Sequence, residues 1–407
     1  MSIDIAAEDL MAAKATRYLS DPAFRRDPWD FFAQVRAESP VIQSDCGVWL
    51  VTGYDAAGEI LRSDAFFSRR NAGQKHLVVD DPTARLTMTS KMLYNDRPAH
   101  TRLRRLVSHA FTRGGIERLR SRIADVANDC LDTIEPAGQV DLVKGYAYPV
   151  VEQIITELLG IRSGAVAQFL VWSDAMVEPP PGADQAHYRQ AANEAVRAIT
   201  AYVRERIAER RDAPAGDLLT KLIRAHEPAD GVLEEHELVA ITVELIHAGF
   251  ETTSNLVSNG ALALLQHPDQ LAALIAEPQL LPTAIDEMLR HQSPAPMAMP
   301  RVAVSDFEVC GKTIAKGDTV IVALAAANRD PSRFTDPERF DIRRKDNNHI
   351  TFGFGAHYCL GNALARLEAT EMFTALLDRA PGMQLAGEAQ WTDHQFFRSL
   401  KTLPVQW

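Results

Sequence analysis

The sequence predicts a mainly α-helical protein with a small β portion. The segment from Glu234 to Pro268 is apolar almost throughout, begins with acidic residues and ends at a proline, as a long buried helix does. About thirty residues in a helix span roughly 45 Å, the width of a whole domain. The 407 residues contain short strand-like segments and no repeat, low-complexity tract or flexible linker. Length alone suggests two or three domains, but we expect a single domain over residues 1–407.

The other elements follow from local patterns. The segment GVWLVTGY at residues 47–54 has the β-branched and aromatic composition of a strand. A proline cluster at residues 177–184 predicts a rigid loop between helices. Residues 307–328 are rich in β-branched residues and carry Gly311 and Gly317 at turn positions, which predicts a hairpin.

Composition and charge exclude several classes of protein. With 46% apolar and 24% charged residues, the chain has the composition of a globular protein. The N-terminus carries acids from Asp4 onward and no unbroken apolar run, so we expect no signal peptide or membrane anchor and a cytoplasmic location. The net charge of −11 argues against nucleic acid as a partner. The four cysteines are far apart and form no C-x-x-C pair, which argues against a disulfide framework or a zinc site.

One cysteine lies in a chemically distinctive place. The glycine-rich segment FGFGAHYCLG, residues 352–361, positions Cys359 just before a strongly helical run. Glycines allow the backbone to approach a bound group closely, and the start of a helix favours a thiolate. On these residues alone, Cys359 is a metal ligand, a nucleophile with His357 as its base, or a buried structural cysteine.

This segment resembles the haem-ligand signature of the cytochrome P450 family, Phe-x-x-Gly-x-x-x-Cys-x-Gly. Phe352, Gly355, Cys359 and Gly361 fill the fixed positions. The resemblance implies that Cys359 is the thiolate ligand of haem b iron. It also implies the fold of that family, with a long central helix over the haem and the cysteine loop beneath it. The resemblance extends from Asp27–Arg36, which is similar to the first helix of the family, to the last predicted strands.

A second motif lies inside the long helix. The segment AGFETT, residues 248–253, resembles the oxygen-activation motif of the family. The resemblance implies that Ala248 leaves room beside the haem. It also implies that Glu251 and Thr252 are the catalytic pair that supplies protons. Without the resemblance, such residues would merely bend a buried helix.

The resemblance implies further haem contacts. Two haem propionates in a partly buried site need charge-assisted donors. Four positions match residues that bind them in the family, namely His100, Arg104, Arg301 and His357. The complete set of implied haem-binding residues is His100, Arg104, Ala248, Arg301, Phe352, Gly353, His357, Cys359 and Gly361.

The segment EMLR resembles the Glu-x-x-Arg helix motif of the family. Glu287 and Arg290 are three residues apart, so they share a helix face and can form an ion pair. Such pairs are usually solvated. With Arg339 from the segment DPERFD, the resemblance implies instead a buried, structural triad that holds the cysteine loop in place.

Eight arginines lie between Arg97 and Arg122, opposed only by Glu117. A basic patch on an acidic protein favours an acidic partner or a bound anion over a merely solvated helix face. The resemblance implies an acidic ferredoxin, which receives electrons from NAD(P)H through a separate ferredoxin reductase because no reductase segment is visible. We expect a monomer, with the ferredoxin docking at Arg102, Arg105 and Arg113.

The substrate pocket is predicted less directly. Glu244 and His247 stand where relatives usually carry apolar residues facing the substrate, and a buried polar group needs a hydrogen-bonding partner. They bind a polar group of the substrate, or they form a hydrogen bond between helices. The apolar candidates, which would otherwise be core residues, are Ala248, Met297, Phe396 and Phe397.

The resemblance therefore implies a haem-thiolate monooxygenase that inserts one oxygen atom of O₂ into an apolar small molecule. We expect a bacterial specialised metabolite with a polyketide-like scaffold. The alternatives are an oxidase that couples, cyclises or oxidises in several steps, and a hydroxylase of terpenoids, steroids or xenobiotics. A haem-binding sensor without turnover is a further alternative, although no output domain is visible.

Overall fold

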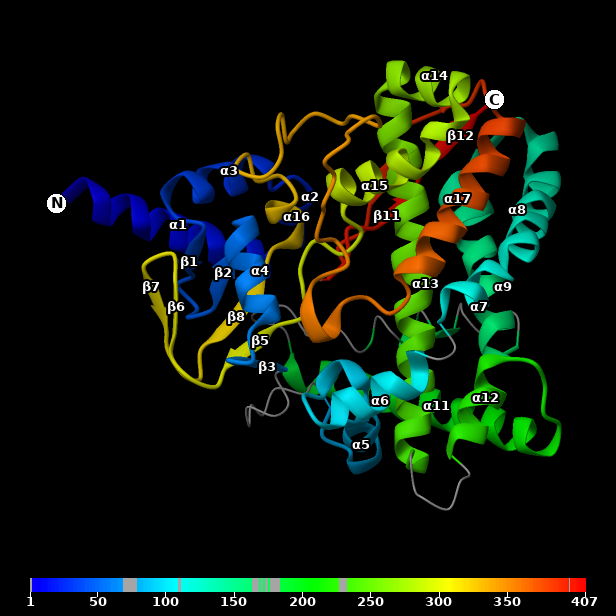
Figure 1. Cartoon of the computed structure of the whole chain (residues 1–407), viewed down its shortest axis with the longest axis horizontal. Coiled ribbons are helices and arrows are strands. Elements are labelled where there is room, and N and C mark those ends of the chain that lie inside the picture. Colours follow the sequence, from blue (N-terminus) through cyan, green and yellow to red (C-terminus); the bar gives the residue numbers. More distant parts are fainter. Residues whose placement is uncertain are drawn as a thin grey trace.

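The computed structural model describes residues 2–407 except 69–78, 109–110, 163–167, 170, 173–174, 176–183, 227–232 and 395. It is mainly helical with a small strand portion, which confirms the predicted fold class. In Figure 1 the largest sheet lies with α1–α4 on the side of the N-terminus, and α7, α8, α9, α12 and α17 lie on the other side of α13. Within the described residues, no helix is both long and apolar enough to cross a membrane.

A mixed five-stranded sheet forms the smaller part of the molecule. Its order is β1 (Val41–Gln43), β2 (Trp49–Val51), β8 (Thr319–Val322), β5 (Arg301–Ala303) and β3 (Phe66–Ser68). Only the β2–β8 pair is parallel, with Val51 opposite Val322. The helices of this part are α1 (Ser2–Ser20), α2 (Pro22–Arg26), α3 (Trp29–Glu38), α4 (Tyr54–Arg62) and α16 (Leu324–Ala327). The segment compared with a first helix therefore forms the third, since α1 and α2 precede it.

The predicted hairpin is present but shorter than expected. Strands β6 (Phe307–Val309) and β7 (Lys312–Ile314) pair around Cys310 and Gly311, which both have positive φ. Gly317, at φ +97°, then turns the chain into β8, which joins the five-stranded sheet instead of extending the hairpin. The remaining strands form a three-stranded sheet of β4 (Gln139–Asp141), β12 (Pro404–Gln406) and β9 (Gln384–Leu385), and a pair of β10 (Gln390–Trp391) and β11 (Leu400–Thr402).

The larger part is a helical body around a large apolar core cluster, with a smaller cluster between α5 and α11. Its longer helices are α5 (Pro82–Ser90), α6 (Ala99–Ser108), α7 (Arg113–Glu117), α8 (Arg120–Ile134), α9 (Tyr148–Leu159), α11 (Gln185–Asp212), α12 (Leu218–His226), α14 (Pro268–Ala276), α15 (Leu281–Gln292) and α17 (Asn362–Arg379). Its short helical turns are η1 (Met92–Tyr94), η2 (Glu135–Ala137), η3 (Val143–Ala147), η4 (Pro278–Leu280) and η5 (Gly355–His357).

The predicted long helix is α13 (Glu235–Gln266), with 32 residues. A capping box starts it: the Glu234 backbone N–H donates to the Glu237 carboxylate, 3.0 Å away, and the Glu234 side chain accepts from the Glu237 N–H. Pro268 opens α14 directly afterwards, where its missing N–H costs no helical bond. Helices α5, α9, α11, α15 and α17 pack against α13, which is why most of its residues are buried.

The predicted Glu287–Arg290 pair is buried, with both side chains 0% exposed and Nε 2.7 Å from Oε2. The third arginine, however, is Arg344 and not Arg339. The Arg344 Nε lies 3.2 Å from Oε2 of Glu287, whereas the Arg339 side chain is exposed. Arg339 contributes only its backbone carbonyl, which accepts a hydrogen bond from Arg290 at 3.0 Å. The choice of Arg339 was wrong because the loop buries the neighbouring Phe340 and directs Arg339 outward.

The corrected triad gives a matched pair of substitutions. We expect Arg344→Met to lower the free energy of unfolding by roughly 3 kcal/mol, because it removes one partner of a buried carboxylate while Arg290 remains. Arg339→Met should change it by less than about 0.5 kcal/mol, since an exposed side chain is lost. Urea denaturation followed by circular dichroism measures both values. Equal losses would contradict the assignment of Arg344.

Candidate functional site

The middle of α13 is open on one face. Its residues are buried almost throughout, yet Ala248 is exposed and Thr252 is half-buried. Glu244, Ala248 and Thr252 are four residues apart and therefore share a face of the helix. Because other helices pack around α13, this exposure marks space inside the protein that side chains leave unfilled.

The cysteine loop is fixed by main-chain bonds. The Cys359 N–H donates to the Phe352 carbonyl at 2.9 Å, and the Asn362 side chain donates to the Cys359 carbonyl at 2.8 Å where α17 begins. Arg366 lies over the Phe352 ring, 4.5 Å from its centroid. Gly353 has φ +71°, a conformation that favours glycine. These contacts present the Cys359 side chain from a rigid frame.

Gly355 and Gly361 of the loop differ in the space around them. A Cβ on Gly355 would lie 2.5 Å from the carbonyl oxygen of Leu61, so the loop packs directly on the backbone of α4. A Cβ on Gly361 would meet no described atom within 4 Å. Gly355 therefore meets a constraint that comes from the protein itself, in addition to the close approach to a bound group that the sequence predicted.

Opposing effects act on the pKa of the Cys359 thiol. Burial raises its pKa, while a hydrogen bond from the Gly361 N–H and the charges of Arg104 and Arg366 act in the opposite direction. Burial prevails, so the start of α17 does not by itself produce a thiolate. A metal cation at the sulfur would supply the missing stabilisation, because a coordinating thiol is deprotonated.

A donor-rich cluster fits an anionic group. The rings of His100 and His357 lie 4.1 Å apart, and burial lowers their pKa values to about 4 and about 2, with Arg104 and Arg301 contributing. Among the described residues, His100 Nε2 and Arg301 Nε are buried without hydrogen-bond partners. Arg104 also donates to the Tyr358 carbonyl at 2.6 Å, which ties α6 to the cysteine loop. Buried donors without acceptors fit the carboxylates of haem propionates.

The two predicted catalytic residues have different surroundings. The Thr252 hydroxyl donates to the Ala248 carbonyl at 2.8 Å. Glu251 is buried, and its Oε1 lies 3.4 Å from the Ser399 hydroxyl. Gly249 packs against α9, since a Cβ there would lie 2.6 Å from Ile155. The open face of the helix is thus provided by Ala248 and Thr252.

Glu244 makes a bond within the protein. Its Oε1 accepts the Leu93 N–H at 3.0 Å, which fixes η1 on α13, while Oε2 is buried and unpaired among the described residues. Burial raises the pKa of Glu244 to about 7 although the nearby Lys91 acts against the shift. Lys91 is itself buried, and its pKa is lowered to about 8. One carboxylate oxygen therefore serves the fold and the other lacks a described partner.

The remaining substrate candidates divide into two groups. Burial lowers the pKa of His247 to about 3, and its ring lies 6.5 Å from that of Phe397. Phe396 and Phe397 are half-buried in the segment before β11. Met297 is only 9% exposed and packs in the cluster formed by α1 and α3, so the structure places it in the core. Its assignment to the pocket remains a prediction, which this packing does not support.

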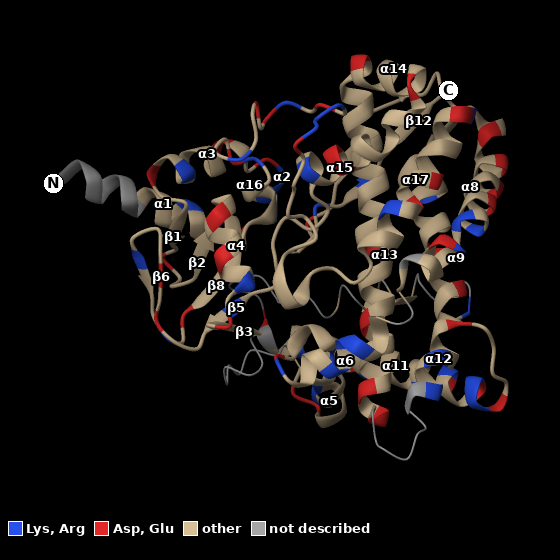
Figure 2. Cartoon of the chain, viewed as in Figure 1, with Lys and Arg blue, Asp and Glu red and all other residues tan. Residues whose placement is uncertain are grey.

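The predicted docking surface also changes. Arg102 forms a bidentate ion pair with Glu237 in the first turn of α13 and is therefore already neutralised. Arg105 is exposed on α6, and the side chain of Arg113 lies outside the described residues. Figure 2 shows basic residues of α6 beside acidic residues of α13. The local charge of this surface is lower than the sequence suggests.

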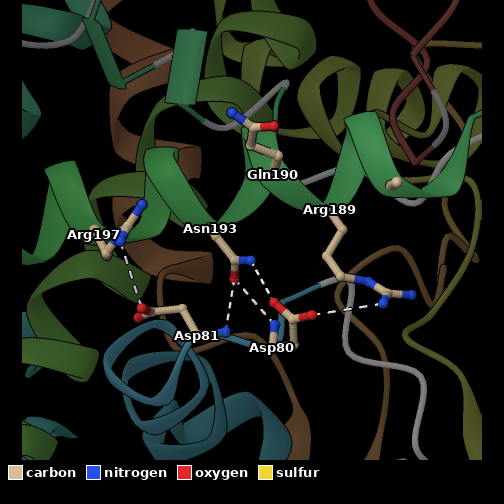
Figure 3. Close-up of a pocket in the computed structure, with 7 residues that line it drawn as sticks. Asp80, Asp81, Arg189, Gln190, Asn193 and Arg197 are labelled. Carbon is tan, nitrogen blue, oxygen red and sulfur yellow. Dashed lines mark hydrogen bonds and ion pairs between the residues drawn. The ribbon is translucent and has the colours of Figure 1, made fainter.

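A groove of about 470 Å³ lies elsewhere, between α11 and the residues that precede α5. In Figure 3, Asn193 reaches between the two aspartates: its amide donates to Asp80 at 2.6 Å and accepts the Asp81 N–H at 3.1 Å. The lining residues are Asp80, Asp81, Ala186, Arg189, Gln190, Asn193 and Arg197. None of them is a predicted site residue, so this groove is separate from the candidate site.

Sequence reasoning missed three residues around the site: Lys91, Arg344 and His394. His394 lies 3.7 Å from Glu251, from which it is 143 residues distant in the chain. No local pattern marks these residues, because each acquires its role from a contact that only the folded chain creates. A buried charge predicted on α13 could have signalled that a partner such as Lys91 must exist.

Comparison with known proteins agrees with this geometry. The family described as Cytochrome P450 matches residues 40–379. The chain is 40% identical to cytochrome P450 monooxygenase PikC of Streptomyces venezuelae, covering 94% of this chain and 92% of that protein. It is 37% identical to the polyketide biosynthesis cytochrome P450 PksS of Bacillus subtilis, covering 94% and 96%. The crystal structure of myxobacterial CYP267B1 in complex with myristic acid superposes with a TM-score of 0.89 at 32% identity, covering 96% and 98%.

Proposed function

Because the chain belongs to the cytochrome P450 family and is a monooxygenase of that family, we propose that it hydroxylates an apolar, polyketide-like molecule of bacterial specialised metabolism. The reaction converts R–H, O₂, two electrons and two protons into R–OH and water. The haem on which this proposal depends is supported by the buried, unpartnered nitrogens of His100 and Arg301, which fit a cofactor with two carboxylates. The name of the relative PksS supports the substrate class.

The residues present fit haem b held by Cys359. When bound there, haem supplies the activation of O₂, with the thiolate donating electron density that favours O–O cleavage. His100, Arg104, Arg301 and His357 would hold the propionates. Phe352, Gly353 and Gly361 shape the loop that presents the sulfur.

Glu251 and Thr252 are proposed to manage the two protons. Glu251 is buried and lies beside polar groups of the segment before β11, so it can take up a proton and pass it inward. The Thr252 hydroxyl donates to the Ala248 carbonyl, which leaves its lone pairs free to accept a hydrogen bond. Ala248 adds little bulk beside them.

The electrons are proposed to come from NAD(P)H through a ferredoxin reductase and an acidic ferredoxin in the cytoplasm. The exposed Arg105 supports docking on α6. Arg113 extends the proposed surface along the sequence. The proposed docking surface leaves out Arg102, because its guanidinium forms an ion pair with Glu237.

The haem-thiolate proposal is tested with purified protein. We expect the reduced carbon monoxide complex to show the red-shifted Soret band of thiolate-ligated haem, and Cys359→Ser to abolish that band. Cys130→Ser, at a cysteine far from the loop, is the matched control and should retain it. Wild-type protein without haem, or with an unshifted band, would contradict the proposal.

The polar residues of α13 are proposed to recognise a hydroxyl or carbonyl of the substrate. We expect wild type to bind a macrolactone alcohol about five- to tenfold more tightly than its deoxy analogue, as one net hydrogen bond provides. Titration of the spin-state shift measures both affinities. In His247→Leu the ratio should fall toward one, and Glu244→Gln tests the carboxylate while keeping an acceptor for Leu93. An unchanged ratio in His247→Leu would remove the histidine from this role.

The docking proposal predicts a charge-dependent loss of affinity. Arg105→Glu should weaken binding of an acidic ferredoxin about three- to tenfold at low salt, with a smaller effect at high salt because ions screen exposed charges. Lys316→Glu makes the same charge change in the turn before β8 and serves as the control. Equal effects of the two substitutions in a calorimetric titration would place the docking surface elsewhere.

A further inference from the structure

His394 and Glu251 form a buried pair that the proposed function leaves unexplained. His394 lies between β10 and β11, and Glu251 lies in the middle of α13. The imidazole Nε2 is 3.7 Å from Oε1 of Glu251, and the two side chains are only 10% and 9% exposed. A buried imidazole beside a buried carboxylate calls for a defined arrangement of protons.

The backbone determines which nitrogen of His394 carries the proton. The N–H groups of Phe396 and Phe397 both donate to Nδ1, each at 3.0 Å. An Nδ1 that accepts two hydrogen bonds carries no proton itself, so the neutral ring has its proton on Nε2. Burial lowers the pKa of His394 to about 4, which keeps the ring neutral near pH 7.

That Nε2–H is directed toward Glu251. Among the described residues, Nε2 is buried without a hydrogen-bond partner. A movement of less than about 1 Å would bring it within bonding distance of Oε1. The Ser399 Oγ lies 3.4 Å from the same oxygen, Oε1 of Glu251, and accepts a hydrogen bond from the Asn255 side chain at 2.7 Å. Ser399 and His394, which both approach Oε1 of Glu251, thus come from the segment that leads into β11.

We propose that His394 is a positioning residue that orients the Glu251 carboxylate for proton supply, through an Nε2–H bond to Oε1. This inference rests on the proposed role of Glu251. His394 neither gains nor loses a proton: Glu251 takes up the proton and passes it on, while the neutral imidazole holds the carboxylate in place. Because the Phe396 and Phe397 N–H groups fix the ring, a segment with two predicted substrate contacts also sets the position of Glu251.

A direct test reads the imidazole itself. Holoenzyme labelled with ¹⁵N-histidine, in its diamagnetic reduced carbon monoxide form, gives long-range ¹H–¹⁵N spectra in which the His394→Asn spectrum identifies the resonance. We expect a proton on Nε2, and a shift of that resonance in Glu251→Gln. Glu234→Gln, at the His236–Glu234 pair where α13 begins, is the control and should leave it unchanged. A proton on Nδ1, or no response to Glu251→Gln, would overturn the proposal.

A double-mutant cycle tests the functional consequence. His394→Asn keeps an acceptor near Nδ1 for the two N–H groups but lacks the donor at Nε2. With the compound that gives the largest spin-state shift, we expect it to raise the fraction of NAD(P)H electrons lost as hydrogen peroxide severalfold. The increase should vanish in a Glu251→Gln background, because His394 acts through Glu251. His236→Asn should leave the fraction unchanged.

The outcomes distinguish the positioning role of His394 from the proton-supply role of Glu251. If Glu251→Gln raises peroxide loss while His394→Asn does not, the positioning role is overturned and the proposed function stands. If Glu251→Gln itself has no effect, the proton-supply role fails and the positioning role fails with it. An increase in His394→Asn that persists in the Glu251→Gln background would assign His394 a purely structural role and overturn the proposal. If His394→Asn does not fold, His394→Gln identifies the resonance instead, and the spectra of wild type and Glu251→Gln decide.

Discussion

The burial of α13 is the constraint on which the rest of the structure depends. A helix of 32 residues can be apolar on nearly every side only if other helices enclose it, as α5, α9, α11, α15 and α17 do here. The opening beside Ala248 and Thr252 therefore depends on how the surrounding helices pack as well as on the residues of α13. Polar groups near that opening must find partners inside the protein, as Glu251 does with the Ser399 hydroxyl.

Local sequence patterns predicted those elements that depend on residues close together in the chain. The long helix, the glycine-rich loop and the Glu287–Arg290 pair each depend on residues close together in the chain, and each is present as a structural element. Arg344 was missed because two arginines of one irregular loop compete for the same carboxylate. In the folded chain Phe340 is buried and Arg344 contacts Glu287, while Arg339 faces outward. The same holds for Met297, whose burial depends on α1 and α3.

Charge was harder to predict than shape. A run of arginines in the sequence suggests one basic surface, yet Arg102 neutralises Glu237 while Arg104 bonds to the cysteine loop. Arg301 belongs to neither group, because it is buried beside His100 and His357. Residues of one charge thus serve a helix contact, a loop contact and a buried cluster. Their positions in the fold, and not their number, determine the field at the candidate site.

The contact between Gly355 and α4 limits which sequences this loop can accept. The atom that a Cβ would strike is a backbone oxygen of Leu61, and a backbone cannot change rotamer to make room. Every substitution at this position must therefore displace the whole loop or the end of α4. Random variation of the loop would keep this glycine even if the bound group were exchanged for another. The fold therefore requires glycine at position 355 whatever group the loop binds.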